Sequence, residues 1–334
     1  MSQNAKLVVR VTVYPHRPEE TVEVERAAFE KEGITFRFVK TTTPEELRAA
    51  IADADAVISG GGVFDEAAFA AMSRGKVMVS CGVGLDRIDL EAAGRHDVMV
   101  CNMPDICTDE VADHAMALLL ACNRKIGLLN NRVKGGVWDR TMLEPMPRLR
   151  GLPVGLLGFG RIAQQMATRC QSFGMVVSAF DPYMSAEVAS KANVKLVDLA
   201  TLLSTSEIVS CHLPHMASTH HMMGEEQFRQ MRKSATFINS SRGRVVDEAA
   251  LVKALREKWI FAAGLDVLED EPPKLDNPLL SMDNVLVTPH AAGFSDEVVD
   301  GIPLLAVQEV MSVLNGGTPR TIAWANKSAF AVTR

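Results

Sequence analysis

Three polar residues in the second half of the chain have the types and positions that proton and hydride chemistry at a carbon–oxygen bond requires. Arg242, Glu271 and His290 each come directly or shortly after an apolar run typical of a strand. A histidine exchanges protons near neutral pH, and a carboxylate beside it favours the protonated imidazole. A guanidinium suits a carboxylate or a polarised carbonyl oxygen. We predict that these three side chains are catalytic, with Arg242 and His290 also binding the substrate.

A glycine-rich turn indicates where a dinucleotide binds. Gly158 and Gly160 stand between an apolar run and a helical run, and Asp181 ends the next apolar run. Such glycines let the backbone approach a pyrophosphate, and the N–H groups near Arg161 and Ile162 then face the phosphates. The acid accepts hydrogen bonds from a ribose diol. Because no basic residue follows Asp181 directly, the pattern favours NAD over NADP, with FAD as a third choice.

These residues need elements that bring them together, and the chain alternates short apolar runs with helical runs from start to end. Alternation of this kind is typical of parallel sheets covered by helices. We therefore predict an α/β fold with two doubly wound parallel-sheet domains, a Rossmann NAD domain and a smaller flavodoxin-like substrate domain. The expected strands are 7–14, 35–39, 56–59, 77–80 and 98–101 in the first set, and 154–157, 176–180, 194–197, 208–212, 235–239, 262–267 and 285–288 in the second.

Two helical segments set the expected domain boundaries. A long helix is predicted at 109–133, after the first set of strands, and a last helix near the end of the chain returns it to the first domain. The substrate (catalytic) domain is then discontinuous, with residues 1–104 plus 296–334, and the NAD-binding domain spans residues 105–295. Ligands commonly bind in a cleft between two such lobes.

Composition limits the kinds of partner and the cellular compartment that we expect for this protein. The 334 residues carry a net charge of −6 with scattered basic residues, so we expect neither a nucleic-acid nor a membrane partner. The longest strongly apolar run, 115–122, is far short of the roughly 20 residues of a membrane span, and the N-terminus lacks signal-peptide features. Six dispersed cysteines without a C-x-x-C pair indicate reduced thiols and a cytoplasmic location.

The other histidines are weaker candidates. His212 and His215, together with His220 and His221, have spacings that metal sites use, yet no third ligand matches them. We therefore predict that no metal is bound. His114 falls inside the long predicted helix, and we assign it to packing.

Taken together, the motifs resemble the D-isomer-specific 2-hydroxyacid dehydrogenase family. Segments 239–248, 265–272 and 288–292 look like the arginine, glutamate and histidine signatures of that family, and 82–89 and 100–104 match its first domain. The resemblance covers most of the chain. It is greatest to the branch that contains phosphoglycerate dehydrogenase and the C-terminal-binding proteins.

The resemblance implies a role for each motif residue. His290 would be the acid/base at the substrate C2 oxygen, Glu271 would pair with it, and Arg242 would bind the substrate and steady its charge. Asp266 interrupts a run that otherwise looks buried, and it would reach the nicotinamide amide. The remaining contacts would come largely from the backbone: Leu213, Pro214 and Ser240 for the cofactor NAD, and Gly62, Val63, Val83 and Gly84 for the substrate carboxylate.

The resemblance also implies an activity, for which several alternatives stay open. Three glycines at 60–62 replace the polar side chains that would grip a phosphorylated substrate, so we favour a small unphosphorylated 2-oxo acid, such as glyoxylate or hydroxypyruvate, over D-3-phosphoglycerate. Gly293 stands where the co-repressors carry a tryptophan, which disfavours an NADH-sensing interaction protein. A hydrolase that uses tightly bound NAD shares the architecture. Family members are usually dimers, so we expect a homodimer through the NAD domain and the helix at 109–133.

Overall fold

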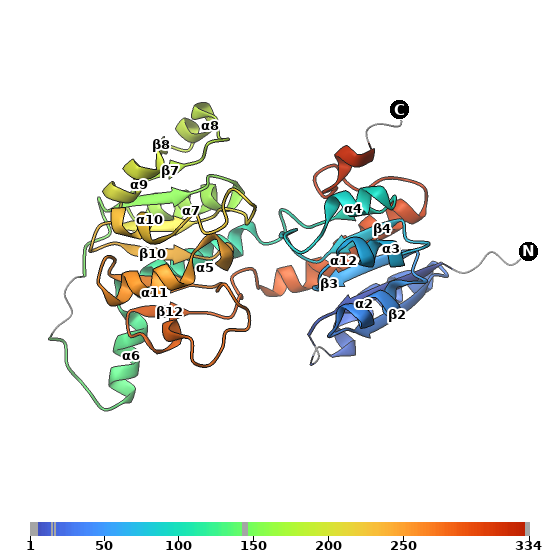
Figure 1. Cartoon of the computed structure of the whole chain (residues 1–334), viewed down its shortest axis with the longest axis horizontal. Helices are drawn as coiled ribbons and strands as arrows, with labels where there is room; N and C mark the ends of the chain where they lie inside the picture. Colours follow the sequence, from blue (N-terminus) through green and yellow to red (C-terminus); the bar gives the residue numbers. More distant parts are fainter. Residues whose placement is uncertain (1–5, 15, 17, 142–145, 331–334) are drawn as a thin grey trace, which may run out of the picture. The chain divides into compact units, whose positions relative to one another are not determined.

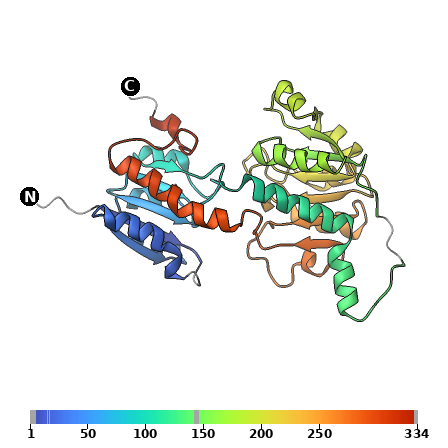
Figure 2. The ribbon, with the colours of Figure 1, turned by 180° about the vertical axis from the view of Figure 1, so that it is seen from behind.

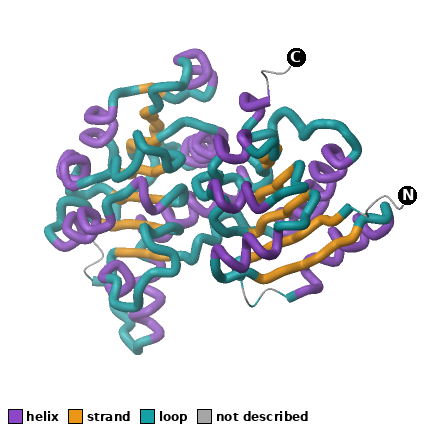
Figure 3. Tube along the Cα trace, turned by 45° about the vertical axis from the view of Figure 1, so that its right-hand side comes forward, coloured by secondary structure: helices purple, strands orange, loops and turns teal. Residues whose placement is uncertain are grey.

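The computed structural model describes residues 6–14, 16, 18–141 and 146–330 (Figure 1). The chain divides into two compact units, Met1–Ile106 with Ser295–Arg334, and Cys107–Phe294. Each unit contains a parallel sheet with helices on its faces, as the distribution of strands and helices in Figure 3 shows. The predicted α/β fold with two parallel-sheet domains is confirmed. The binding role predicted for each domain is a separate matter, which the architecture alone does not decide.

Among the described residues, the sheet of the first unit has five parallel strands in the order β2-β1-β3-β4-β5. This is the flavodoxin-like order, in which ligands bind beyond the carboxyl ends of the strands. The strands are β1 (Leu7–Thr12), β2 (Thr35–Lys40), β3 (Ala56–Gly60), β4 (Val77–Ser80) and β5 (Met99–Cys101).

Helices cover both faces of this sheet because its strands are apolar on both sides. Val8 and Val9 are neighbours in β1, and they pack into different core clusters on opposite faces. One face carries η1 (Glu19–Val22), α1 (Glu23–Lys31) and α12 (Asp296–Leu314), and the other carries α2 (Pro44–Ile51), α3 (Glu66–Ala71) and α4 (Leu90–Arg95) (Figures 1 and 2). Helix α12 is the predicted last helix. A short η4 (Lys327–Phe330) follows it.

The sheet of the second unit has the order β12-β11-β10-β9-β6-β7-β8 within the described residues. Counted from β6, this is the Rossmann order with one further strand at the β12 edge, and the order reverses between β6 and β9. The strands are β6 (Pro153–Leu157), β7 (Val176–Phe180), β8 (Lys195–Leu196), β9 (Ile208–Cys211), β10 (Thr236–Asn239), β11 (Ala262–Leu265) and β12 (Val285–Val287).

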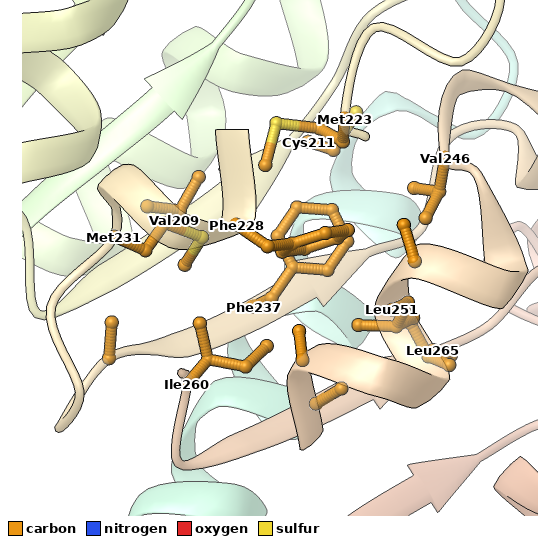
Figure 4. Close-up of a cluster of buried hydrophobic side chains, with 14 of the residues drawn as sticks. Val209, Cys211, Met223, Phe228, Met231, Phe237, Val246, Leu251, Ile260 and Leu265 are labelled. Atoms are coloured by element: carbon orange, nitrogen blue, oxygen red, sulfur yellow. The ribbon is translucent and has the colours of Figure 1, made fainter. Parts of the chain in front are cut away.

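Two core clusters hold the helices of the second unit on its sheet. In Figure 4, Phe228 and Phe237 meet edge to face at the centre of one cluster, with their ring centroids 5.4 Å apart. That cluster contains α9 (Leu199–Thr205), α10 (Glu225–Gln230) and α11 (Glu248–Arg256), while the other contains α5 (Thr108–Asn123), α7 (Arg161–Ser172) and α8 (Ala186–Lys191). Two short 3-10 helices, η2 (Gly243–Val245) and η3 (Pro278–Ser281), lie in loops after β10 and β11.

The single long helix predicted at 109–133 is wrong. The structure has two helices, α5 and α6 (Ile126–Lys134), separated at Lys125, whose backbone is left-handed with φ 54°. Lysine is a good helix former, so the local sequence carries no break signal. Just after the break, Gly127 of α6 lies so close to Leu286 of β12 that a Cβ would sit 2.6 Å from Cδ2 of that leucine. No described helix combines the length and the apolar character that crossing a membrane demands.

Candidate active site

Adjacent strands bring three of the predicted site residues to one edge of the second sheet. Strands β10, β11 and β12 are parallel neighbours, so their carboxyl ends lie side by side. Arg242 follows β10, Asp266 follows β11, and His290 follows β12. Strand β11 ends at Leu265, so Asp266 comes just after the strand and does not interrupt it as we predicted. This is the edge at which doubly wound sheets bind ligands.

Glu271 and His290 form a direct pair at this edge. The Nδ1 atom of His290 lies 2.8 Å from Oε2 of Glu271. The other carboxylate oxygen of Glu271 accepts a hydrogen bond from the backbone N–H of Leu268, at 3.2 Å, which orients the carboxylate. The His290 side chain is 50% exposed, so its ring is open to a substrate. Because Nδ1 is engaged, Nε2 is the nitrogen that can exchange a proton with a bound molecule.

The loop that carries His290 has an unusual backbone held by a buried carboxylate. His290 has φ 53°, in the left-handed region that non-glycine residues seldom adopt. Its N–H donates to the carbonyl of Asp266, at 2.8 Å. Asp266 is buried, and its side chain accepts hydrogen bonds from the N–H groups of Ala291 and Ala292, each at 2.9 Å. Asp266 therefore shapes the histidine loop, and its contact with a nicotinamide amide stays a prediction.

The segment around Arg242 is fixed by its backbone. Asn239 donates a side-chain hydrogen bond to the carbonyl of Arg242, at 3.0 Å, and Nη1 of Arg242 donates to the carbonyl of Ser241, at 2.7 Å. The next residue, Gly243, passes so close to the chain after β11 that a Cβ would lie 1.8 Å from the carbonyl oxygen of Leu268. This contact ties the arginine loop to the loop that leads to Glu271.

The glycine turn has the geometry that its sequence predicts. Gly158 has φ 83°, and its N–H donates to the carbonyl of Phe180, at 2.8 Å. The carboxylate of Asp181 accepts from the N–H of Phe159, at 2.9 Å, so the acid and the turn hold each other. A Cβ at residue 158 would lie 3.2 Å from the carbonyl of His212. Glycine is therefore required here for both conformation and space.

The residues after this turn fit a dinucleotide. An added Cβ on Gly160 would meet no described heavy atom within 4 Å, so the backbone is open on that side. Helix α7 begins at Arg161 and Ile162, and the N–H groups of its first turn favour an anion such as pyrophosphate. Leu213 and Pro214 follow β9, next to β6 at the point where the strand order reverses, and Ser240 follows β10. These residues fit NAD, with Asp181 for the ribose.

The predicted substrate loops lie at the carboxyl ends of neighbouring strands in the first unit. Gly62 and Val63 follow β3, Val83 and Gly84 follow β4, and β3 pairs with β4 in parallel. Gly62 has φ 106°, a conformation that glycine favours, and Val63 is 55% exposed. The carbonyl of Val83 accepts from the side chain of Asn102, at 2.7 Å, which steadies the second loop. Binding of a substrate carboxylate by these groups stays a prediction.

The remaining histidines have partners of their own. His215 Nε2 lies 3.2 Å from His220 Nδ1, the rings of His220 and His221 stack at 4.0 Å, and His221 Nε2 lies 2.8 Å from Glu269 Oε1. Within the described residues, no three or more His, Cys, Asp or Glu side chains are placed to hold a metal ion. Burial lowers the pKa of His212 to about 4, so its ring is neutral at pH 7.

The structure shows contacts of His114 that the sequence did not indicate. His114, which we assigned to packing, has Nε2 2.8 Å from Oγ1 of Thr288 and 3.4 Å from Oδ1 of Asp266. Its partners lie more than 150 residues further along the chain, so the spacing around His114 carries no signal of them. Only the packing of α5 against β11 and β12 reveals the contact.

The fold and the site together define an α/β protein with a dinucleotide turn and a histidine–carboxylate pair on one sheet edge. A family model described as the D-isomer specific 2-hydroxyacid dehydrogenase, NAD binding domain, matches residues 116–292. The chain belongs to this family, and NAD is the cofactor that its second unit fits.

Named relatives divide between two activities. The chain is 39% identical to the D-3-phosphoglycerate dehydrogenase of Methanocaldococcus jannaschii over 82% of the chain and 52% of that relative. It is 33% identical to the glyoxylate reductase of Thermococcus kodakarensis over 95% of the chain and 96% of that relative. The chain thus spans about half the length of the phosphoglycerate dehydrogenases that it matches.

A comparison of folds with a solved structure supports the same family. The D-lactate dehydrogenase of Aquifex aeolicus, crystallised with NAD and lactic acid, superimposes with a TM-score of 0.83. It is 27% identical to this chain, and the match covers 92% of this chain and 96% of that one. The two chains therefore share the whole architecture.

Proposed function

We propose that the protein is an NAD-dependent oxidoreductase that interconverts a small unphosphorylated 2-oxo acid, of the glyoxylate or hydroxypyruvate type, and its D-2-hydroxy acid. The observation that carries this proposal is the Glu271–His290 pair, 2.8 Å apart, on the sheet edge that also holds Arg242. An acid–base pair and a fixed cation are what reduction of a 2-oxo acid asks of the protein itself.

Each side chain has a separate task in this reaction. When bound, NADH supplies the hydride. His290 donates a proton from Nε2 to the C2 oxygen in the reduction and takes it back in the oxidation. Glu271 holds Nδ1, which orients the ring and leaves Nε2 for the substrate. Arg242 binds the carboxylate or the C2 oxygen and offsets the negative charge that develops there.

Two observations support an unphosphorylated substrate. Strand β3 ends at Gly60, and Gly61 and Gly62 follow it, so this turn contributes backbone N–H groups and no cationic side chain for a phosphate. The glyoxylate reductase of T. kodakarensis also matches this chain over nearly its full length, whereas the phosphoglycerate dehydrogenases match over about half of theirs. D-3-phosphoglycerate remains the second candidate because two relatives with that name are each 39% identical to this chain.

A substrate panel tests the proposal. Steady-state NADH oxidation is measured with glyoxylate, hydroxypyruvate, pyruvate and 3-phosphohydroxypyruvate, and with NADPH as the matched cofactor. We expect turnover with an unphosphorylated acid, and a kcat/KM for the phosphorylated acid that is lower by about tenfold or more. A higher kcat/KM with 3-phosphohydroxypyruvate would assign the phosphoglycerate activity. NADH binding without turnover of any acid would defeat the redox proposal and favour an NADH-sensing protein.

We also propose a homodimer formed through the second unit. Helix α6 buries none of its residues within the chain, and apolar side chains on it and just after it are open to solvent. Sedimentation should give twice the mass of the chain, and Trp138→Glu should weaken the assembly, because a charge is costly inside an apolar interface. A monomeric wild-type protein would contradict this. The apolar side chains are Ile126, Val133, Val137 and Trp138, with exposures of 56%, 49%, 48% and 91%.

A cytoplasmic location is the remaining part of the proposal. The six cysteines all lie in the described residues, and no disulfide joins them. Burial raises the pKa of Cys122 and Cys170 to about 12, so these thiols stay protonated and inert at neutral pH. Cysteines that form no disulfide suit a reducing compartment. Fractionation of cells that express the protein tests the location.

A further inference from the structure

We propose that His114 is a positioning residue: it holds the loop that carries His290, acting through Thr288 and Asp266. His114 belongs to α5, and the three other residues lie at the ends of β11 and β12. The catalytic side of this inference rests on the proposed function of His290 as the proton donor. Its structural side, the anchoring of the loop, can be measured without any turnover.

The hydrogen bonds leave one consistent assignment of donors. An ionised carboxylate accepts only, and Asp266 accepts from the N–H groups of Ala291 and Ala292 as well as from the hydroxyl of Thr288, at 2.6 Å. The single hydroxyl proton of Thr288 is therefore used toward Asp266. Its Oγ1 must then accept at 2.8 Å from Nε2 of His114, which carries a proton. The hydrogen bonds therefore run from His114 on α5 through Thr288 to Asp266, and each group donates to the next.

Asp266 needs this support because its carboxylate is fully buried. Its side chain is 0% exposed, and Nε2 of His114 lies 3.4 Å from its Oδ1. A buried carboxylate with too few hydrogen-bond donors destabilises the folded protein. The donors that Asp266 has therefore also fix the orientation of its carboxylate. Loss of the His114 donor would leave Thr288 free to rotate and would weaken its grip on Oδ1.

The orientation of Asp266 matters because the loop it holds is strained. His290 adopts φ 53°, and such backbone conformations persist only when their surroundings determine them. The carboxylate of Asp266 fixes the two residues after His290, and its carbonyl fixes the N–H of His290 itself. A small rotation of this carboxylate would therefore move the imidazole relative to Glu271. Misplacement of a reacting group by about 1 Å can cost around a hundredfold in rate.

Three variants separate this role from packing. His114→Leu keeps the size of the side chain and removes the donor, whereas His114→Gln places an amide donor near the position of Nε2. Thr288→Val removes the hydroxyl with little change in volume. Leu119→Val, a substitution of a buried residue of the same helix in the core cluster shared with α7 and α8, controls for general loss of stability. Each protein is assayed for kcat, for KM, for NADH affinity, and for hydrogen exchange across residues 288–294.

We expect His114→Leu to lower kcat by about tenfold or more, with KM for the 2-oxo acid changed far less. The N–H groups of Ala291 and Ala292 should exchange faster in this variant. Thr288→Val should behave alike, and the double variant should lose no more than either single one, because both break the same chain of bonds. His114→Gln should restore most of kcat and of the exchange protection. Leu119→Val should lower the unfolding temperature and keep kcat.

Unchanged exchange at residues 291 and 292 in His114→Leu would overturn the proposal, whatever the activity. So would a kcat loss that follows the unfolding temperature equally in His114→Leu and Leu119→Val. If the wild-type protein turns over no 2-oxo acid while the exchange pattern follows these expectations, the proposed function fails and the anchoring stands. The two failures are therefore distinguishable.

Discussion

The two sheets of this protein are built alike but carry different residues at their carboxyl edges. In the first unit, Gly61 and Gly62 follow β3, and Gly82, Val83 and Gly84 lie in the loop after β4, with Gly62 and Gly84 among the predicted substrate contacts. In the second unit, the loops after β10, β11 and β12 present ionisable side chains. The contrast teaches that a doubly wound sheet supplies only the location of a ligand edge. The residues placed there decide whether that edge only binds a ligand or also catalyses its reaction.

Elementary physical chemistry explains why the carboxyl edge of the first sheet suits the proposed binding of the substrate, and that of the second sheet the proposed proton transfer. Backbone N–H groups bind an anion without themselves gaining or losing protons, so they are suited to recognition. Proton transfer needs a group whose charge changes near neutral pH, and that group must be a side chain. Substitutions on the first edge should therefore act mainly on KM, and those on the second mainly on kcat.

The largest expected effect comes from the acid–base group of the second edge. His290→Gln should lower kcat by about 10²- to 10⁴-fold, because it removes proton transfer and keeps a similar shape. NADH affinity, measured by fluorescence titration, should change little. His96→Gln is the matched control, since His96 pairs with a glutamate on the surface of the first unit. Activity loss in the control, or intact activity in His290→Gln, would remove the basis of the comparison.

A glycine next to Arg242 should control the stability of the second edge. Gly243→Ala places a Cβ 1.8 Å from a backbone oxygen, and relief requires a shift of the chain, at a cost of about 3 kcal/mol in the free energy of unfolding. Gly160→Ala meets no described atom within 4 Å, so urea unfolding should leave its stability nearly unchanged. Its NADH affinity should fall instead, because the new methyl group occupies the space for the pyrophosphate. Equal effects of both substitutions on stability would contradict this distinction.

The buried His212, which follows β9, should make the stability of the protein depend on pH. Burial lowers the pKa of His212 to about 4, from an ordinary value near 6.5. The unfolded chain therefore takes up this proton first as the pH falls. The contribution of His212 to stability is complete above about pH 6.5 and declines toward pH 4, by about 3 kcal/mol in all.

Urea unfolding at a series of pH values measures this decline, and His212→Gln should make it shallower between pH 6.5 and 4. A slope that is the same in the wild type and in His212→Gln would show that the histidine does not resist protonation in the folded state.

The smallest expected effect belongs to the first edge. Gly62→Ala forces an alanine to φ 106°, which costs about 1–2 kcal/mol and disturbs the loop after β3. KM for the 2-oxo acid should rise severalfold while kcat stays close to that of the wild type. Gly316→Ala provides the matched control, because φ 83° gives a similar strain at the end of α12, away from this loop. If both variants raise KM equally, the substrate contact assigned to the first edge is wrong.

Much of the fold could be predicted because its signals are local. Short apolar runs bounded by turn residues mark the strands, and β6 and β7 match the runs predicted around the glycine turn almost residue for residue. The break at Lys125 could not be predicted, because lysine favours a helix and the nearby approach of Gly127 to Leu286 joins parts of the chain that are far apart in sequence. Local propensity yields to packing at that point.

From the residue order alone, one can derive the glycine turn with Asp181 beside it, the parallel strands, and the types of group that could exchange a proton or hold an anion. These features depend on spacing within one or two elements, where chain connectivity limits the geometry. Tertiary structure decided that His290 meets Glu271, that its backbone is left-handed, and that His114 reaches Thr288. Those contacts join distant parts of the chain, and their geometry depends on how whole helices and strands pack.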